Sequence, residues 1–365
     1  MSRQAARTVV RILVASLVTG GTTLLAPPEA SAAIEVRRVV DGLNAPVAFT
    51  FGPGRKIWYV EKNTGEVRIY NRATGGDRLF VQVPRVNGDG ERGTLGVALH
   101  PRYPDTPFVY VYATRNIDGG AVRNQILRYR DRDGRGVGRR VMVSNANGAT
   151  SHNGGRILFG PDGMLYAIVG DAVDAANAQD LSNEERGKIL RLRPGGGVPN
   201  DNPFDDRVYA YGIRNSFGFA FDPETDVLWE TENGPECNDE VNVVESGRNY
   251  GWGPNETCSG NAPQNTNQDG PNPVLPATLY QATIGITGIA FCDGCGLGPQ
   301  SEGAAFHGAV TNARITRLTI NQARDGIASR EVVANAGGGT LSFEVGPTGA
   351  IYFSTFSGIF KLVQL

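Results

Sequence analysis

Hydrophobic positions along the chain recur in short alternating stretches, a pattern that predicts strands rather than helices. Residues 34–40 and 359–365 mix apolar and polar side chains with the two-residue period of a strand that buries one face. Only residues 183–190 suggest a helical period. Residues 255–270 are rich in Asn, Gly, Pro and Gln and predict a long loop. The pattern therefore predicts an all-β chain.

One phrase recurs five times: an apolar residue, a turn with proline, and an apolar–aromatic pair. Proline fixes φ and Gly or Asp closes the turn before the next strand. The repeated prolines are Pro53, Pro101, Pro161, Pro223 and Pro347. Their separations are 48, 60, 62 and 124 residues, so a degenerate sixth copy is expected near residues 285–310, at 303–306. Six such units predict a six-bladed β-propeller whose N- and C-terminal strands close the ring in one blade.

The N-terminus has the composition of a secretion signal. Three arginines precede an apolar stretch at residues 12–26, and residues 30–32 read Ala-Ser-Ala. We therefore expect residues 1–32 to be a signal peptide, residues 33–365 to be a single propeller domain, and the protein to be secreted or extracytoplasmic. An uncleaved anchor is the alternative, although the apolar stretch is short for a bilayer. No membrane association is expected after cleavage.

Charge and cysteine content narrow the class further. The formal net charge of −2 becomes −4 once the three arginines and one glutamate of the signal are removed. An acidic chain without a run of basic residues is not expected to bind nucleic acid. In an exported protein, four cysteines predict two disulfides. We prefer the local pairs Cys237–Cys258 and Cys292–Cys295. The Cys292–Cys295 spacing would also suit half of a zinc site, but no second such pair and only three histidines accompany it.

Two polar constellations are candidates for chemistry. His152 lies in a loop beside two glycines, where a ligand can approach closely, and histidine is the usual general base near neutral pH. His100 and His307 lie in repeat units and are interpreted as structural. Arg214 and Asn215 stand at an otherwise apolar entry to a repeat and could both face a pocket at a bend. The alternative for Arg214 is a buried ion pair.

Residues 232–242 and 247–252 are rich in carboxylates and turn residues. Carboxylate and carbonyl oxygens are the ligands that Ca²⁺ prefers. The spacing is not that of an EF-hand, and a solvated acidic loop is the alternative interpretation.

In these segments the chain resembles the glucose/sorbosone dehydrogenase family of soluble six-bladed propellers, which use pyrroloquinoline quinone (PQQ) and Ca²⁺. The resemblance extends from about residue 44 to residue 252. Its motifs are residues 88–96 with His100 and Pro101, residues 152–156 and 170–171, residues 187–191, 201–204 and 214–215, and residues 233–235, 239–240 and 249–252.

The resemblance implies a role for each matching residue. His152 matches the base that takes the proton of the sugar C1 hydroxyl, and Arg214 and Asn215 match residues that bind PQQ and polarise its reacting carbonyl. Glu91 stands where many members have Gln in the cofactor site. The carbonyls of Gly234 and Pro235 match ligands of the cofactor's Ca²⁺. Glu240 and the carbonyl of Tyr250 match ligands of a second, structural Ca²⁺.

The chain departs from the family where cations are expected. The fifth-blade stretch 309–313 contains no Lys, and two family Arg positions are occupied by Gly339 and Leu341. PQQ has three carboxylates, and each charge-assisted bond contributes about 1.5–3 kcal/mol. The cofactor pocket is therefore rebuilt, weak or lost, and Arg314 and Arg317 are the candidate replacements.

Three functions follow, and whether the chain is an enzyme stays open at this point. The first is a PQQ- and calcium-dependent dehydrogenase that oxidises an aldose or related polyol and passes electrons to an acceptor that the sequence does not identify. The second is a non-catalytic, calcium-containing propeller that binds carbohydrate. The third is a hydrolase that acts through Ca²⁺ and His152. In each case the expected partner is a small-molecule sugar, and His152 and Arg214 are expected to share a cavity near the propeller axis.

Overall fold

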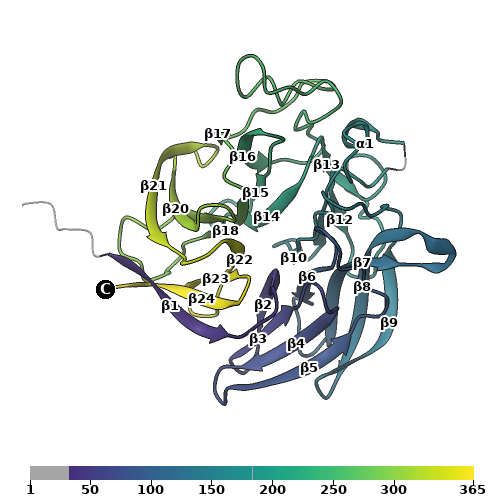
Figure 1. The fold of residues 1–365 in the computed structure, drawn as a ribbon, viewed down its shortest axis with the longest axis vertical. Helices are drawn as coiled ribbons and strands as arrows, with labels where there is room; N and C mark the ends of the chain where they lie inside the picture. The colour runs from purple at the N-terminus through teal and green to yellow at the C-terminus, as the bar shows by residue number, and fades with distance from the viewer. Residues whose placement is uncertain (1–32, 183) are drawn as a thin grey trace, which may run out of the picture. The chain divides into compact units, whose positions relative to one another are not determined.

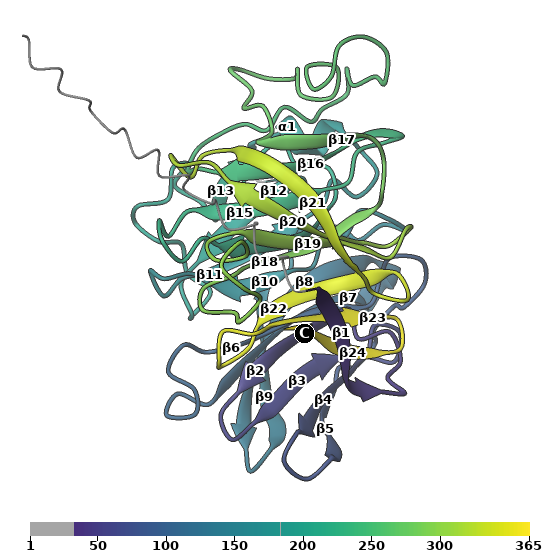
Figure 2. The same ribbon diagram turned by 90° about the vertical axis from the view of Figure 1, so that its left-hand side faces the viewer.

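A computed structural model describes residues 33–182 and 184–365. These residues form 24 strands in six four-stranded antiparallel sheets (Figures 1 and 2). The predicted signal peptide and its cleavage site lie outside the described residues.

Each sheet is one blade of a β-propeller, and its strands follow one another in chain order except in the last blade. The first blade contains β2 (Ala48–Gly52), β3 (Lys56–Val60), β4 (Glu66–Asn71) and β5 (Gly76–Gln82). The second contains β6 (Thr94–Leu99), β7 (Phe108–Asn116), β8 (Val122–Arg132) and β9 (Arg135–Val143). The third contains β10 (Ile157–Phe159), β11 (Leu165–Val169), β12 (Lys188–Leu192) and β13 (Val208–Tyr211). The fourth contains β14 (Ser216–Phe221), β15 (Leu228–Glu232), β16 (Cys237–Val244) and β17 (Thr278–Ala282). The fifth contains β18 (Ile286–Phe291), β19 (Ala305–Ala309), β20 (Arg314–Ile320) and β21 (Ile327–Asn335). The closing blade contains β22 (Thr340–Val345), β23 (Ile351–Thr355), β24 (Gly358–Gln364) and β1 (Ile34–Asp41).

The ring closes as the alternating pattern of its two ends predicts. β1 pairs antiparallel with β24, from Ile34 opposite Gln364 to Asp41 opposite Gly358 (Figure 1). The pairing covers the outer edge of β24, which would otherwise present unpaired backbone groups. The predicted six-bladed fold with shared terminal strands is confirmed.

The repeated proline turn connects the first strand of a blade to the second. Pro53 lies between β2 and β3, and Pro161 lies between β10 and β11. In the fifth blade the degenerate copy begins with Phe291 at the end of β18 and resumes where Ala305 and Phe306 open β19. The longer connection between these strands contains the Cys292–Cys295 disulfide. Residues 303–306 are thus the second half of the expected sixth copy.

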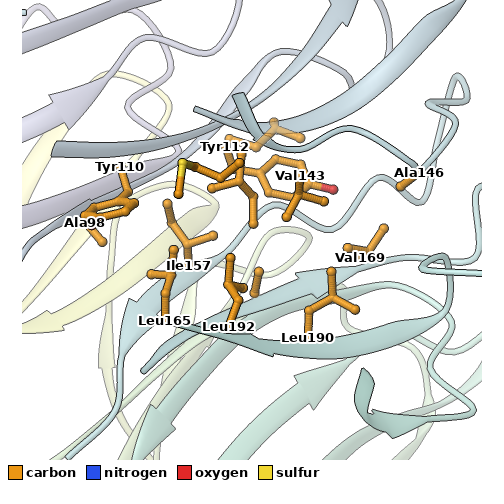
Figure 3. Packing of buried hydrophobic residues seen from close by; sticks show 14 of the residues in the cluster. Ala98, Tyr110, Tyr112, Val143, Ala146, Ile157, Leu165, Val169, Leu190 and Leu192 are labelled. Atoms are coloured by element: carbon orange, nitrogen blue, oxygen red, sulfur yellow. The ribbon is translucent and has the colours of Figure 1, made fainter. Parts of the chain in front are cut away.

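Apolar side chains are buried between blades, because each sheet presents both faces to its neighbours. Within the described residues, one hydrophobic cluster lies between each pair of adjacent blades. Between the second and third blades, Tyr110 and Val143 pack toward Ile157 and Leu165 (Figure 3). This packing holds the first strands, and the loops that precede them, at fixed positions around the axis.

Two local predictions have different outcomes. The disulfides Cys237–Cys258 and Cys292–Cys295 are both present, as expected. The helix suggested by the pattern of residues 183–190 is not found in residues 184–190, because Lys188 already begins β12. All residues of β12 are buried between β11 and β13. The helical elements described are the short α1 (Ala176–Gln179) and a 3₁₀ turn, η1 (Asp118–Gly120). No helix in residues 33–182 or 184–365 is long and apolar enough to cross a membrane.

Candidate active site

The loops that lead into the first strands enclose a cavity of about 510 Å³. His152 precedes β10 and Arg214 precedes β14, so the two residues occupy equivalent positions in neighbouring blades. Both line this cavity. The other predicted site residues that line it are Glu91, Asn215, Gly234 and Pro235. The expected convergence of these loops is what the structure shows.

His152 is oriented by a buried carboxylate. Its Nδ1 lies 2.7 Å from Oδ1 of Asp171, whose other oxygen accepts a hydrogen bond of 2.8 Å from the indole N–H of Trp252. A carboxylate only accepts when ionised, so the Nδ1 proton points to Asp171 and the lone pair is left on Nε2. Asp171 and Trp252 were not assigned roles from the sequence, although both belong to motifs of the family resemblance.

The backbone around His152 is held tightly for this purpose. The φ of His152 is +57°, in the left-handed region that non-glycine residues seldom adopt. Its N–H donates to Oε2 of Glu91 at 2.8 Å. Gly170 passes so close that a Cβ there would lie 2.4 Å from the carbonyl oxygen of His152. The strain and the close approach place the imidazole at the cavity wall.

Arg214 is a partly buried cation that lines the same cavity as His152. Its Nη1 donates to the carbonyl of Asn233 at 2.9 Å, and its guanidinium carbon lies 5.2 Å from the centre of the Trp252 ring. Burial lowers the pKa of Arg214, while the charges of Asp171 and Glu232 act in the opposite direction. The guanidinium remains charged near neutral pH. Its buried Nε has no hydrogen-bond partner among the described residues.

Asn215 and Glu91 connect the second, third and fourth blades. Nδ2 of Asn215 donates to Oε2 of Glu91 at 3.3 Å, the same oxygen that accepts the backbone N–H of His152. Two donors to one oxygen suit a carboxylate as well as the family's Gln. Oδ1 of Asn215 is buried and has no partner in the described chain. Both Arg214 and Asn215 thus retain unused hydrogen-bonding atoms.

A second, much smaller cavity lies behind Gly234 and Pro235 and is also lined by Glu232 and Glu240. Asp239 fixes this loop: one oxygen accepts the N–H of Gly234 at 3.0 Å and the other accepts that of Ile284 at 2.7 Å. The disulfide at Cys237 anchors the same segment. The carbonyls of Gly234 and Pro235 are therefore held in a rigid turn beside acidic side chains.

The predicted structural calcium ligands are brought together by an asparagine. Nδ2 of Asn267 donates to the carbonyl of Tyr250 at 2.8 Å and to Oε2 of Glu240 at 3.2 Å. Burial raises the pKa of Glu240 to about 8 and that of Glu230 to about 7, and it raises the pKa of Glu232 well above its ordinary value. Three carboxylates are thus buried close together, which is costly without a cation or shared protons. No group of three His, Cys, Asp or Glu side chains in the described residues is arranged to hold a metal ion.

The prediction that Arg314 or Arg317 supplies positive charge to the cavity was wrong. Arg317 donates to Oε2 of Glu331 at 2.6 Å, and Arg314 is exposed; neither lines the cavity. Both residues belong to β20, the third strand from the axis, so they lie too far out in the blade. The cations that do line the cavity with Arg214 are Lys62 and Arg156. Arg156 belongs to a motif of the family resemblance, but nothing in the pattern around it predicts that it lines the cavity.

The remaining histidines lie away from the cavity. His307 is fully buried, and its Nε2 is 2.7 Å from the hydroxyl of Tyr280. Nδ1 of His100 accepts the backbone N–H of Arg102 at 3.1 Å within its repeat turn. Both contacts agree with the structural interpretation of these residues.

The geometry agrees with comparison to known proteins. The profile of the family described as glucose/sorbosone dehydrogenase matches residues 43–362. The chain belongs to this family.

Several individual proteins are similar to this chain over much of its length. The chain is 28% identical over 357 residues to an aldose sugar dehydrogenase, YliI, of Escherichia coli K12, across 92% of this chain and 94% of that protein. It is 30% identical over 245 residues to quinoprotein glucose dehydrogenase B of Acinetobacter calcoaceticus, a match that covers 59% of this chain and only about half (51%) of that protein. The PQQ-bound aldose sugar dehydrogenase of Streptomyces coelicolor superposes with a TM-score of 0.78 at 27% identity, over 93% of this chain and 99% of that one.

Proposed function

We propose that this glucose/sorbosone dehydrogenase family member is an exported quinoprotein that oxidises an aldose or related polyol with PQQ and Ca²⁺. The observation that carries the proposal is the oriented pair of His152 and Asp171, which opens on the same cavity as Arg214 and Asn215. A base with a defined lone pair and a partly buried cation line one cavity. Oxidation of a hydroxyl group needs both.

The residues of the cavity fit PQQ. Its volume of about 510 Å³ lies within the range of sites for small molecules. Nε of Arg214 and Oδ1 of Asn215 are buried without partners, and a bound polar group would supply them. The rigid carbonyls of Gly234 and Pro235 suit a hard cation such as Ca²⁺ next to the cofactor. PQQ would supply the two-electron acceptor that takes hydride from the sugar carbon.

In this proposal the protein's own residues position and deprotonate the substrate. Nε2 of His152 accepts the C1 hydroxyl proton of the sugar, and Asp171 stabilises the imidazolium that results. Arg214 offers its guanidinium to the oxygen on which negative charge develops. Glu91 holds the backbone of His152 and the side chain of Asn215 together, so the base and the cofactor residues stay in register.

Glu240 and the carbonyl of Tyr250 would hold a second, structural Ca²⁺. The closely placed carboxylates of Glu230 and Glu232 support a cation in this region, because a positive charge would offset their mutual repulsion. Export is supported by the two disulfides, which persist in oxidising compartments.

The second candidate is a calcium-containing propeller that binds carbohydrate without turnover. The apolar wall of the cavity, where Val310 and Leu341 stand in place of expected cations, favours it. A single experiment separates the two candidates: purified protein is given PQQ, Ca²⁺ and a panel of sugars, and dye reduction is followed. We expect turnover for wild type and a loss of at least 100-fold for His152→Ala. Sugar binding without PQQ-dependent turnover would instead establish the binding protein.

A further inference from the structure

Three cations line the cavity, and none of them has an ion-pair partner in the described chain. They are Lys62, Arg156 and Arg214. Of the other buried arginines, Arg191 is ion-paired with Asp162 at 2.8 Å, whereas Arg115 bonds only to neutral acceptors. Unpaired buried cations are costly, and an anion is the partner that removes the cost.

Arg156 is the most deeply buried of the three and has no role predicted from the sequence. It directly precedes β10 of the third blade, lines the cavity and is only 7% exposed. It donates to Oγ of Ser342 at 2.8 Å and to the carbonyl of Phe217 at 3.3 and 3.4 Å, all neutral acceptors. Burial lowers the pKa of Arg156 and the charge of Glu344 acts in the opposite direction, but Arg156 forms no ion pair with any described residue.

Lys62 is the second such cation, on the wall formed by the first blade. Its ammonium group donates to the carbonyl of Gly90 at 2.7 Å, to Oδ1 of Asn63 at 2.9 Å and to the carbonyl of Gly88 at 3.1 Å. These partners are neutral as well. Lys62 is partly buried, and burial lowers its pKa while the charges of Glu91 and Asp89 act in the opposite direction.

The wall formed by Val310 and the start of β22 leaves no room for a side chain at position 339. A Cβ at Gly339 would lie 2.4 Å from the carbonyl oxygen of Val310, so the two segments have closed against each other. Leu341 and Val310 line the cavity there with apolar side chains. The cations near these segments are Lys62, which follows the second strand of the first blade, and Arg156, whose guanidinium donates to Ser342 and to the carbonyl of Leu341.

We propose that Lys62 and Arg156 form the carboxylate-binding part of this cavity and hold the carboxylates of PQQ. The inference rests on the proposed function. It places the cofactor's carboxylates between Lys62 of the first blade and the guanidinium of Arg156, which lies against Ser342 of the closing blade. Arg214 is then left for the quinone end of the ligand.

Calorimetric titration of the intact apo-protein in Ca²⁺ tests the proposal with two probes, PQQ and its trimethyl ester, which keeps the rings but has no carboxylate charge. We expect wild type to prefer the acid. Lys62→Met and Arg156→Met should each weaken PQQ binding by about tenfold or more and change ester binding by less than about twofold. Arg314→Met, which removes an exposed arginine of the fifth blade, is the matched control and should change neither.

Each other outcome counts against the proposal. Equal weakening of acid and ester would show that Lys62 and Arg156 only shape the cavity, and unchanged binding would place the carboxylates elsewhere. If wild type binds both probes equally, the carboxylate site is wrong while the cofactor assignment stands. If it binds neither, the proposed function fails as well. Thermal melts check that each variant folds, and Lys62→Met carries the test if Arg156→Met does not.

Discussion

Replacement of Asp171 by asparagine is the sharpest probe of the catalytic geometry. Oδ1 of Asp171 receives both Nδ1 of His152 and the backbone N–H of Val173, at 2.7 and 2.8 Å. Its Oδ2 receives the indole N–H of Trp252 at 2.8 Å. Asparagine offers one acceptor oxygen and one donor group. In either orientation the amide NH₂ therefore faces a donor, and one orientation also favours the wrong tautomer of His152.

The expected loss follows from what the carboxylate does. Asp171 is 1% exposed, so its interaction with the imidazolium that forms during proton transfer is little screened by water. A hydrogen bond to a charged group contributes about 1.5–3 kcal/mol. Losing it in the transition state lowers kcat by about 10- to 150-fold. Because Asp171 does not line the cavity, KM and the affinity for PQQ should change little.

The assay is steady-state dye reduction with PQQ and Ca²⁺ present, together with a PQQ titration of the same preparation. Asp174→Asn is the control, since Asp174 is exposed in the same loop and bonds only to a local backbone N–H. An Asp171→Asn enzyme with wild-type kcat would refute the orientation argument. A parallel loss of kcat and PQQ affinity would show that Asp171 only supports the local fold.

Three further results are expected. Removal of Ca²⁺ by a chelator should lower the melting temperature, because an ion at one hundred times its Kd adds about 2.7 kcal/mol to the stability of the native state; an unchanged melt, or a Glu240→Gln variant with the same calcium response as wild type, would contradict the predicted site. Burial lowers the pKa of His307 to about 4, so stability present above pH 6.5 should be lost as the pH falls through 4, by about 3 kcal/mol, and this pH-dependent loss should be absent in His307→Phe. Mass spectrometry of the secreted protein should show cleavage near Ala32, and an intact N-terminus would disprove the predicted signal.

Much of the fold was predictable because its rules are local. A proline turn followed by an aromatic pair specifies the connection from the first to the second strand wherever it occurs, so the number of blades could be counted. The alternation at both ends specified a shared blade. The strand at residues 188–190 was not predicted, because a strand that is buried on both faces has no polar side to mark its two-residue period.

The candidate site was predictable only where the position of a loop in its blade determines which residues face the cavity. His152 and Arg214 each precede a first strand, and such loops converge at the axis. Asp171 reaches His152 because the two residues extend the antiparallel pair of β10 and β11, where the N–H of Ala172 donates to the carbonyl of His152 at 3.1 Å. The register of that pair was not predicted from the sequence. Arg314 and Arg317 lie close in sequence to the position of the missing lysine, which predicted that they line the cavity. The prediction failed because the distance of a residue from the axis depends on which strand of the blade it occupies.

The seam between β1 and β24 makes assembly of the cavity an all-or-none event. Ile34 and Gln364 pair although they are roughly 330 residues apart, and closing so long a loop costs about 5 kcal/mol of chain entropy. Across the same seam, the N–H of Ala45 donates to the carbonyl of Phe356 at 2.9 Å, and both residues line the cavity. A nascent chain that lacks β24 has no complete cavity to fill. Ligand binding should therefore report the last step of folding, and a bound ligand would stabilise the closed ring against opening between β1 and β24.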